Sequence, residues 1–462
     1  MDGQGFASIG GLLQMIRKIE SKGFYIDECR LPGESKADDR VPAQHNTIQL
    51  SRDRWFVVYE TRGFRGVDDN CSVVYQIRRD TPDGVVLTEG YLDPSIDDWD
   101  PVGNGGRFVR QGNHSIAFGV PKGALFEGHR VPHENVFVVA WGNHARALDP
   151  ESGYLWARSE MGVPPGTSRC TWAQFRLNDE EDDIELLQQK TALRQKGYEE
   201  GEALCSHEEL RSMNHSFVAP VPYNEDGSEW AHMQHWEGVC LPVRYRWNPE
   251  TGLYEWVESG PQLKGPSGAR IGEGSIVPYR GEWLAAARMG GKDFGIVWFR
   301  CSDLFGSEPT PIFSDAVGSN CPRTVYGFPD GVVRLFTTDQ RNSPYQDIYQ
   351  RRIPLNLLDI DPDHGFAVTR SHIVFDSIKE GLPIPKKHAP TMHFGRLLPH
   401  GGGSTGLASF FVRTRAILPR AYTMGNYKGI ATRPEIEASG VYYCELTYDQ
   451  ELPPTWTFET VS

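Results

Sequence analysis

Short segments of alternating hydrophobic and polar residues recur along the chain, and turns rich in Gly, Asp, Asn or Pro separate them. A period of two is typical of β-strands with one buried face, and closely spaced turn residues join such strands into hairpins. Six blocks of strand-like segments follow one another. They contain residues 47–84, 114–141, 215–256, 274–300, 323–355 and 388–446.

Six similar blocks predict a repeated architecture. The chain has 462 residues, which exceeds the usual size of one compact core. Radial repetition of small sheets avoids this limit, because each sheet packs against its neighbours and only short edges stay exposed. We therefore predict an all-β fold, a six-bladed β-propeller over residues 31–462, preceded by an N-terminal helix and lead-in over residues 1–30.

Two segments depart from the strand pattern. Ile9 to Ile19 reads as a short amphipathic helix. Asn178 to Met213 contains an acidic stretch that includes residues 180–183, then apolar residues at roughly helical intervals, and then basic residues. Acidic residues at the start and basic residues later suit the helix dipole. We predict a helical insertion over about residues 178–213, either a lid or a contact for a second subunit.

The composition supports an all-β chain and limits its partners. The chain has 49 Gly, 32 Pro, 12 Trp, 18 Tyr and 22 Phe, which suits many short strands and turns. A net charge of −14 argues against a nucleic-acid-binding surface, although it is compatible with a local basic pocket. No apolar stretch reaches the roughly 18 residues that a membrane span requires. The oligomeric state stays open.

The chain carries no sign of a leader, a metal site or a cofactor motif. No basic leader with a long apolar run is visible before residue 30, so we expect a cytoplasmic location, or secretion if a leader has been removed. The eight cysteines are scattered without CxxC spacing, which predicts isolated buried thiols. The histidine clusters fit no standard metal site. No nicotinamide, flavin or phosphate-loop motif precedes a helix, so we expect no cofactor.

The first segment with candidate chemistry surrounds the first predicted blade. Arg40-Val-Pro precedes an apolar strand, Tyr59-Glu-Thr-Arg62 ends the return strand, and Asp68-Asp69 lies in the next loop. Planar guanidinium groups bind a carboxylate in a forked geometry that lysine cannot copy. A nearby aspartate can donate and accept protons. Several arginines that converge on one point would form a site for an anionic sugar within an acidic protein.

The second such segment lies in the fourth block. Glu273-Gly-Ser opens a hairpin, and the return strand of that hairpin ends at Arg288. A glutamate that faces a phenol can make the phenol nucleophilic. Attack by a tyrosine with the help of a carboxylate is sensible when the substrate already carries a negative charge.

The two segments, in this order, resemble the sialidase superfamily. In that family an Arg-Ile-Pro tripeptide precedes the first strand, an Ala-Glu-x-Arg and an aspartate loop follow it, and a Glu-x-Ser hairpin later ends in arginine. The resemblance covers about residues 40–355 and implies a divergent six-bladed BNR/Asp-box propeller. The turns at residues 80–84 and 248–252 are similar to degenerate Asp-box turns, which lie on the outside of the blades.

The resemblance implies a role for each matched residue. Arg40 would hold the substrate carboxylate, and Arg288 would be the second of three arginines that do so. Asp69 would be the general acid/base, with the adjacent Asp68 as a competitor for that role. Glu273 would polarise a tyrosine nucleophile, which is the known exception to the two-carboxylate glycosidase scheme.

The third arginine and the tyrosine have no clean motif. For the arginine we favour Arg341, which follows a strand end in the fifth block, over Arg351 and Arg352. The family places its tyrosine about one blade later, yet residues 353–421 contain none. We take Tyr422 as the candidate. Two further tyrosines are left as alternatives: Tyr427 downstream and Tyr345 upstream.

Three functions are compatible with these residues. The leading hypothesis is a glycoside hydrolase that releases a terminal, carboxylated sugar, with Arg62 and Asp68 as further substrate contacts. The second is a polysaccharide lyase that cleaves beside a uronic acid, and the third is a non-catalytic glycan-binding propeller. In each case the partner is an anionic carbohydrate, not a nucleic acid or a membrane. The candidates for the lyase chemistry are His45-Asn46, His114, Tyr59 and Arg62.

Overall fold

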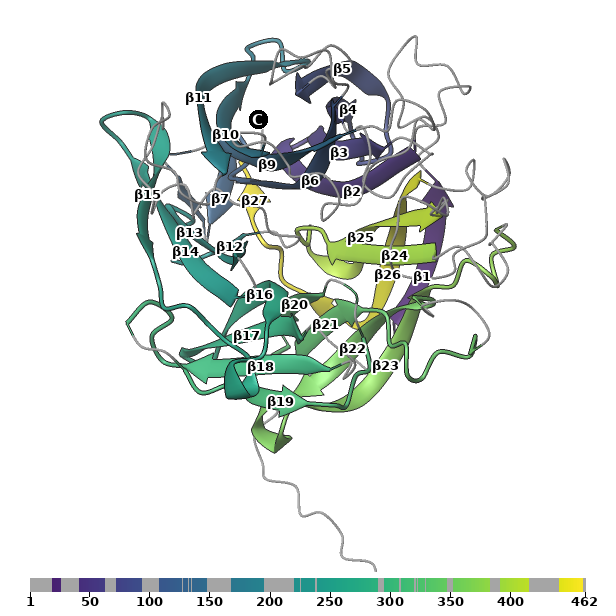
Figure 1. The fold of residues 1–462 in the computed structure, drawn as a ribbon. Helices are drawn as coiled ribbons and strands as arrows, with labels where there is room; N and C mark the ends of the chain where they lie inside the picture. Colours follow the sequence, from purple (N-terminus) through teal and green to yellow (C-terminus); the bar gives the residue numbers. More distant parts are fainter. Residues whose placement is uncertain are drawn as a thin grey trace, which may run out of the picture.

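The protein folds almost entirely as antiparallel β-sheet. Six sheets of four strands each are arranged around a common centre (Figure 1), which makes the fold a six-bladed β-propeller. The computed structural model describes residues 19–25, 41–62, 72–93, 108–147, 168–194, 220–289, 295–346, 352–382, 391–414 and 440–459, apart from positions 127, 132, 134, 225, 237, 238, 307, 308, 320, 322 and 329.

Each of the first three blades is a meander that begins with its innermost strand. The first blade consists of β2 (Val41–Ser51), β3 (Arg54–Arg62), β4 (Ser72–Arg79) and β5 (Val86–Asp93). The second consists of β6 (Phe108–Gly119), β9 (Val136–Ala147), β10 (Ser168–Leu177) and β11 (Ile184–Arg194). The third consists of β12 (Val221–Pro222), β13 (Glu229–Trp236), β14 (Val239–Asn248) and β15 (Leu253–Ser259).

The next two blades repeat this plan, and the last one borrows a strand from the other end of the chain. The fourth consists of β16 (Ile271–Tyr279), β17 (Glu282–Met289), β18 (Ile296–Cys301) and β19 (Ile312–Ser314). The fifth consists of β20 (Thr324–Gly327), β21 (Val333–Thr337), β22 (Leu355–Asp361) and β23 (Ala367–Phe375). The sixth consists of β24 (Thr391–Leu397), β25 (Gly403–Thr414), β26 (Gly440–Leu452) and β1 (Ile19–Tyr25).

The N-terminal strand β1 completes the sixth blade. It pairs antiparallel with β26 in a continuous register from Ile19 opposite Tyr448 to Tyr25 opposite Tyr442. Residues 19–25 therefore belong to the propeller, and the predicted domain boundary at residue 31 is wrong. The predicted helix over residues 9–19 lies outside the described residues, except that Ile19 begins β1.

A separate hydrophobic core fills each junction between neighbouring blades. The side chains that alternate along the strands point to the two neighbours in turn, so that Ala117 packs towards the first blade and Phe118 towards the third. All six junctions have such a core, including the one between the sixth and first blades, where Tyr443 packs with Trp55 and Tyr59. Each fully buried large apolar side chain contributes about 1.5–3 kcal/mol. The ring of cores holds the blades at fixed positions around the axis.

Similar turns connect the third and fourth strands in three blades. They span residues 80–84, 248–252 and 361–365, and each begins with Asp or Asn and ends with Gly. The Asp361 carboxylate accepts hydrogen bonds from the backbone N–H groups of Asp363 and His364, which fixes the bend. Gly365 and Gly252 have φ angles of 68° and 67°, a region that favours glycine. Two of these turns are the ones that the sequence analysis assigned to the outside of the blades.

The predicted helical insertion over residues 178–213 is wrong where the structure describes it. Residues 178–183 form a tight turn in which the Asn178 side chain accepts hydrogen bonds from the backbone N–H groups of Asp182 and Asp183, at 3.0 and 3.1 Å. Ile184–Arg194 then form β11, the outermost strand of the second blade, paired with β10. Residues 195–213 lie outside the described residues.

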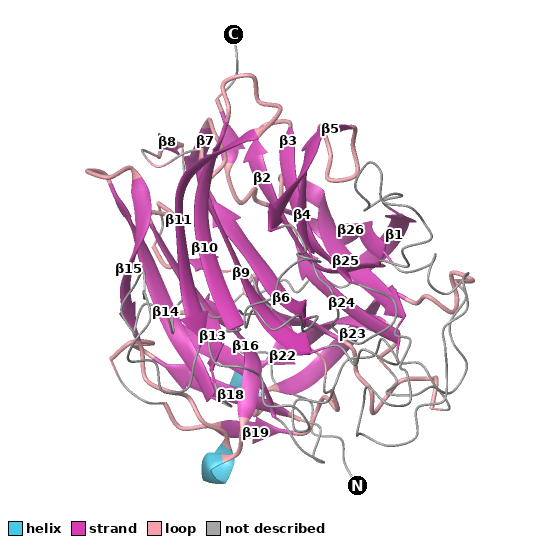
Figure 2. Ribbon diagram, turned by 45° about the horizontal axis from the view of Figure 1, so that its top comes forward, coloured by secondary structure: helices cyan, strands magenta, loops and turns pink. Residues whose placement is uncertain are grey.

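The C-terminal segment crosses the centre of the propeller. After β26 the chain (yellow in Figure 1) runs across the axis to β27 (Thr457–Phe458), which pairs with β7 (Ala124–Phe126). β7 pairs in turn with β8 (His129–Arg130) in a small extra sheet beside the second blade. Figure 2 shows that strands dominate and that the helical elements are short. None of the described helices is long and apolar enough to cross a membrane.

Candidate functional site

One face of the propeller holds Glu273 and Arg288, two of the residues predicted from the sequence. Each blade begins with its innermost strand, so the N-terminal ends of these strands open on the same face. β2 begins directly after Arg40, Glu273 lies near the start of β16, and Arg288 lies near the end of β17. This face is therefore the place to look for the predicted chemistry.

Glu273 and Arg288 come together on the hairpin of β16 and β17. The register of the two strands shifts between Gly272 and Ser275, so Glu273 lies in a β-bulge, and its φ angle is 51°. A bulge redirects a side chain, and a non-glycine residue in this region is strained by about 1–3 kcal/mol. The Glu273 carboxylate reaches the Arg288 guanidinium, with Oε2 and Nη1 2.8 Å apart.

The ion pair joins a buried carboxylate to an accessible guanidinium. The Glu273 side chain is 8% exposed, whereas that of Arg288 is 31% exposed. A guanidinium has five donors in a planar fork, a geometry that matches a carboxylate. The arrangement suits a ligand carboxylate that approaches from the solvent side.

A second arginine, Arg323, supports this hairpin from the fifth blade. It stands directly before β20 and is completely buried. Its guanidinium donates hydrogen bonds only to backbone carbonyl groups among its described contacts, so it ties the end of β17 to the connection between the fourth and fifth blades. The acceptors are Ala287 at 3.1 Å, Gly295 at 3.2 Å, Ser319 at 3.0 Å and Cys321 at 2.9 Å.

The charges of the three residues influence one another. Burial and the positive charge of Arg288 lower the pKa of Arg323 to about 9, although the negative charge of Glu273 opposes both effects. The thiol of Cys240 is close to the same group: burial raises its pKa to about 12, and Glu273 contributes to the increase. Two arginines and one glutamate give this site a net positive charge, which favours an anionic ligand.

Several predicted site residues lie outside the described part of the chain. Arg62 is the last residue of β3, and its backbone pairs with Val41, the neighbour of Arg40. Arg62 is therefore at the same face as the Glu273–Arg288 pair. The residues outside the described part are Arg40, Asp68, Asp69, Arg351, Tyr422 and Tyr427.

The candidate residues from the fifth block lie at different positions around the fifth blade. Arg341 is exposed, donates a hydrogen bond to the backbone carbonyl of Asp315 and lies 3.7 Å from its carboxylate, on the connection from the fourth blade. Arg352 is buried. The Tyr345 hydroxyl is hydrogen-bonded to both oxygens of Asp376, at 2.9 and 2.7 Å, just beyond the outermost strand β23. Tyr345 is thus grouped with Asp376 at the outer strand.

The histidine and tyrosine of the lyase hypothesis lie in the interior of the protein. His45 on β2 and Tyr59 on β3 stand opposite each other, and neither has exposed surface. Burial and the Arg396 guanidinium lower the pKa of His45 to about 3, although a hydrogen bond with the backbone of Ser409 opposes both effects. A base without access to solvent does not reach a polymeric substrate, so this pair offers no lyase site.

Sequence analysis missed Arg323 as a part of the site. The only available signal was its position, since it precedes the innermost strand of its blade as Arg40 precedes β2. The described residues contain no group of three or more His, Cys, Asp or Glu side chains that could hold a metal ion. The four described cysteines form no disulfide; Cys240, Cys321 and Cys444 are buried, and Cys301 is half-buried.

Comparison with known proteins places the fold. The sequence matches no protein-family model and no curated protein. The match with the K499G mutant of NanB sialidase from Streptococcus pneumoniae covers 91% of this chain and 70% of that sialidase chain, with a TM-score of 0.52 and 10% identity. The chain has a sialidase-like β-propeller fold.

Two other solved structures match this sialidase-like propeller over most of its length. The match with a protein of unknown function from Dyadobacter fermentans DSM 18053 covers 94% of this chain and 99% of that protein, with a TM-score of 0.49 and 10% identity. The match with the Trypanosoma rangeli sialidase in complex with 2,3-difluorosialic acid covers 87% of this chain and 54% of that sialidase, with a TM-score of 0.48 and 7% identity. At such low identities a likeness shows the fold alone.

Proposed function

We propose that this protein is a glycosidase that releases a terminal, carboxylated sugar at the face where Glu273 and Arg288 meet. The observation that supports this function is the pairing itself. A strained bulge holds a buried carboxylate against a partly exposed guanidinium, at the end of the inner strands of a sialidase-like propeller. Backbone strain of this kind, at the end of the inner strands, is typical of functional positions.

Binding would depend on converging arginines. Arg288 offers a forked set of donors to the sugar carboxylate, and Arg323 fixes the strand end from which Arg288 projects. In the proposed site Arg40 and Arg341 complete the set of three arginines, and Arg62 and Asp68 contact the rest of the sugar. This arrangement places an anion within a protein whose overall charge is −14.

The proposed reaction is hydrolysis of the glycosidic bond. Asp69 donates a proton to the leaving-group oxygen and later takes one from water. Glu273 accepts a proton from the nucleophile, for which Tyr422 is the candidate, or from an attacking water. A neutral phenol suits a substrate that carries a carboxylate next to the reacting carbon, because a negatively charged nucleophile would be repelled.

The first prediction concerns turnover by the Glu273–Arg288 pair. With fluorogenic aryl glycosides of sialic acid and of glucuronic acid, Glu273→Gln should lower kcat/KM by at least about 100-fold, because the carboxylate can no longer accept a proton. Arg288→Lys should raise KM by about tenfold or more, because lysine cannot form the forked contact. Initial rates over a range of substrate concentrations measure both effects.

Glu282→Gln is the matched control. Glu282 lies on the same hairpin and is paired with Arg300 at 2.6 Å, towards the opposite end of the strands, so its loss should leave kcat/KM within about twofold. Wild-type turnover that survives Glu273→Gln would contradict the proposal. Asp69→Ala should abolish turnover and preserve binding. A product that absorbs in the ultraviolet would indicate a lyase instead, and binding without any product would indicate a glycan-binding protein.

A further inference from the structure

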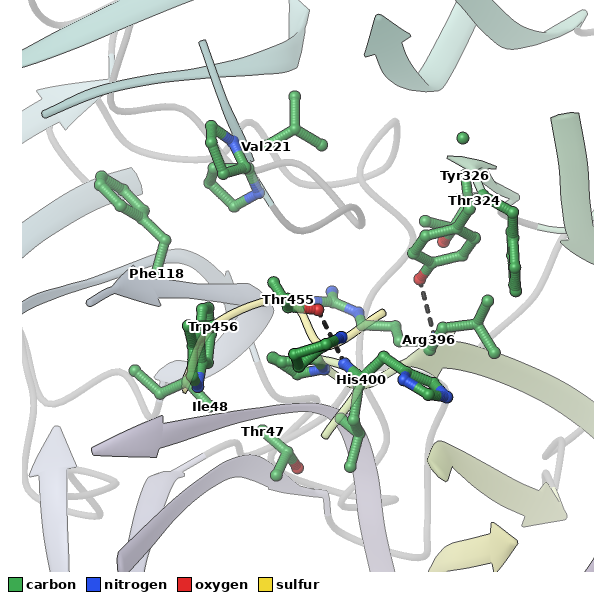
Figure 3. A pocket seen from close by; sticks show the side chains of 18 of the residues that line it. Thr47, Ile48, Phe118, Val221, Thr324, Tyr326, Arg396, His400, Thr455 and Trp456 are labelled. Carbon is green, nitrogen blue, oxygen red and sulfur yellow. Dashed lines mark hydrogen bonds between the residues drawn. The ribbon is translucent and has the colours of Figure 1, made fainter. Parts of the chain in front are cut away.

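A half-open cavity of about 430 Å³ lies on the axis of the propeller, and neither Glu273 nor Arg288 lines it. This axial cavity is surrounded by the inner strands of several blades towards their C-terminal ends, the end opposite to the proposed glycosidase site. Figure 3 shows it from close by, with Phe118 and Val221 on one side and Tyr326 on the other. Its volume is in the range of pockets that hold small organic ligands.

The C-terminal segment forms one wall of the axial cavity. Leu452 to Trp456 line it, and two hydrogen bonds join Thr455 to His400: the Thr455 N–H donates to the His400 carbonyl at 2.7 Å, and the His400 N–H donates to the Thr455 hydroxyl at 2.8 Å. The Trp456 indole N–H donates to the Gln49 side chain at 3.1 Å. The segment is held at two places, so this wall does not have to form when a ligand binds.

Apolar side chains line most of the axial cavity. Aromatic residues from three parts of the chain contribute, with Phe118 from β6, Trp230 from β13 and Trp456 from the C-terminal segment. Phe118 and Trp230 are in contact, with ring centroids 5.1 Å apart. Such a lining favours the apolar body of a ligand over water, and it favours an aromatic ring because rings attract one another beyond the area that they bury.

The charges around the axial cavity favour a neutral ligand. The described residues that line it include no Asp or Glu, so a cation would find no carboxylate there. Arg396 lines the cavity, but it is 4% exposed and has partners of its own, so its charge does not call for an anionic ligand. Burial lowers the pKa of His400 below its usual value of 6.5, so this second basic group is neutral near pH 7.

Asn46 adds one specific polar group to this apolar lining. It lies on β2, lines the axial cavity and is 2% exposed. Its Oδ1 accepts a hydrogen bond from the Thr47 N–H at 3.0 Å, which fixes the orientation of the side-chain amide. The other end of the amide is therefore the Nδ2 donor, which is buried and makes no hydrogen bond with any described residue. A buried donor without a partner is costly, so an acceptor on a ligand would stabilise it.

We propose that the axial cavity binds a small neutral aromatic compound that carries one hydrogen-bond acceptor, such as a ketone or amide oxygen. The ring of this ligand lies against the aromatic side chains of the wall, and its acceptor receives a hydrogen bond from the Asn46 amide. A plain hydrocarbon would leave that donor unpaired, and a charged compound would bury its charge in an apolar space. This site is independent of the proposed glycosidase activity, since it uses other residues at the other end of the axis.

Fluorine NMR titration with a matched pair of ligands tests this site. The ketone para-fluoroacetophenone and the hydrocarbon para-fluoro-α-methylstyrene have nearly the same shape, and only the ketone has an acceptor oxygen. Wild-type protein should bind the ketone with a Kd of about 1 mM or below, which is within reach of a ligand of about ten non-hydrogen atoms. Asn46→Leu should weaken binding of the ketone by about fivefold or more and leave binding of the hydrocarbon within about twofold, because only the ketone loses a hydrogen bond.

Two further variants locate the bound ligands. Val221→Trp fills the axial cavity, so it should weaken binding of both ligands by about tenfold or more, and it serves if Asn46→Leu does not fold. Arg288→Gln should bind both ligands as the wild type does, whether or not the protein shows glycosidase activity. No binding of the ketone to the wild type, unchanged binding in Val221→Trp, or equal effects of Asn46→Leu on the two ligands would overturn the proposal.

Discussion

At the scale of single residues, burial and neighbours decide what each arginine does. Arg288 is partly exposed and lies against the Glu273 carboxylate, so a ligand can reach it from solvent. Arg323 is buried among backbone carbonyl groups and serves as a support. Arg334 is buried between two carboxylates, with contacts of 2.9 Å to Asp330 and to Asp359, and this ion-pair cluster joins β21 to β22 in the fifth blade. The amino-acid type alone separates none of these roles.

The sequence revealed residues whose partners lie nearby in the chain. Glu273 and Arg288 belong to one hairpin, so their spacing already indicated that they meet. No role was predicted for Arg323 or Arg396, because the residues around them come from segments far apart in the chain. For the tyrosine, the sequence left three candidates, of which Tyr345 is hydrogen-bonded to Asp376 in the structure. Long-range packing, which no local motif encodes, accounts for the difference.

A buried histidine should make stability depend on pH. His232 is 1% exposed, and burial lowers its pKa to about 3. It is neutral in the folded protein, whereas in the unfolded chain it binds a proton below about pH 6.5. Its contribution is therefore complete above about pH 6.5 and is lost as the pH falls towards 3.

His232→Gln should reduce this pH dependence. Between about pH 6 and pH 4, the slope of the free energy of unfolding against pH should fall by up to about 1.4 kcal/mol per pH unit. Urea unfolding at several pH values measures the slope. The control is His364→Gln, because the His364 side chain is 81% exposed and its loss should change the slope much less. Equal slopes for wild type and His232→Gln would show that His232 titrates normally.

At the scale of elements, the sequence predicted inner strands better than outer ones. Strands with two buried faces, such as β3, carry apolar residues that match the expected positions. β11 was mistaken for helix because it is an outermost strand: Leu186 and Leu187 are 54% and 37% exposed, so burial imposes no period of two on it. Its position is set by backbone pairing with β10, which leaves no pattern in the sequence.

The pairing of β1 with β26 predicts that the N-terminal strand stabilises the propeller. Removal of residues 1–25 deletes β1 and leaves β26 as an open edge, whereas removal of residues 1–18 keeps β1. The longer deletion should lower Tm by at least about 5 °C relative to the shorter one, because a whole strand pairing is lost. It should also promote self-association through the free edge. Calorimetry and light scattering measure these effects, and identical Tm values would contradict the role of β1.

At the scale of the whole molecule, the propeller places two distinct features along one axis. The N-terminal ends of the inner strands present the Glu273–Arg288 pair at one face. The opposite half of the axis contains a half-open cavity that Arg396 lines. Both depend on the ring of six interblade cores, because Arg323 of the fifth blade supports the pair in the fourth and residues of several blades line the cavity. An acidic protein can in this way hold localised positive charge without a basic surface.

The central claim is that the carboxylate of a sugar is recognised where Arg288 meets Glu273. Calorimetric titration with the 2,3-dehydro analogue of sialic acid and with its methyl ester tests it most directly, because the two ligands differ only in that charge. The acid should bind wild-type protein at least about tenfold more tightly than the ester, and this difference should disappear in Arg288→Gln. Equal affinities of acid and ester for the wild type, or an unchanged difference in Arg288→Gln, would contradict the account.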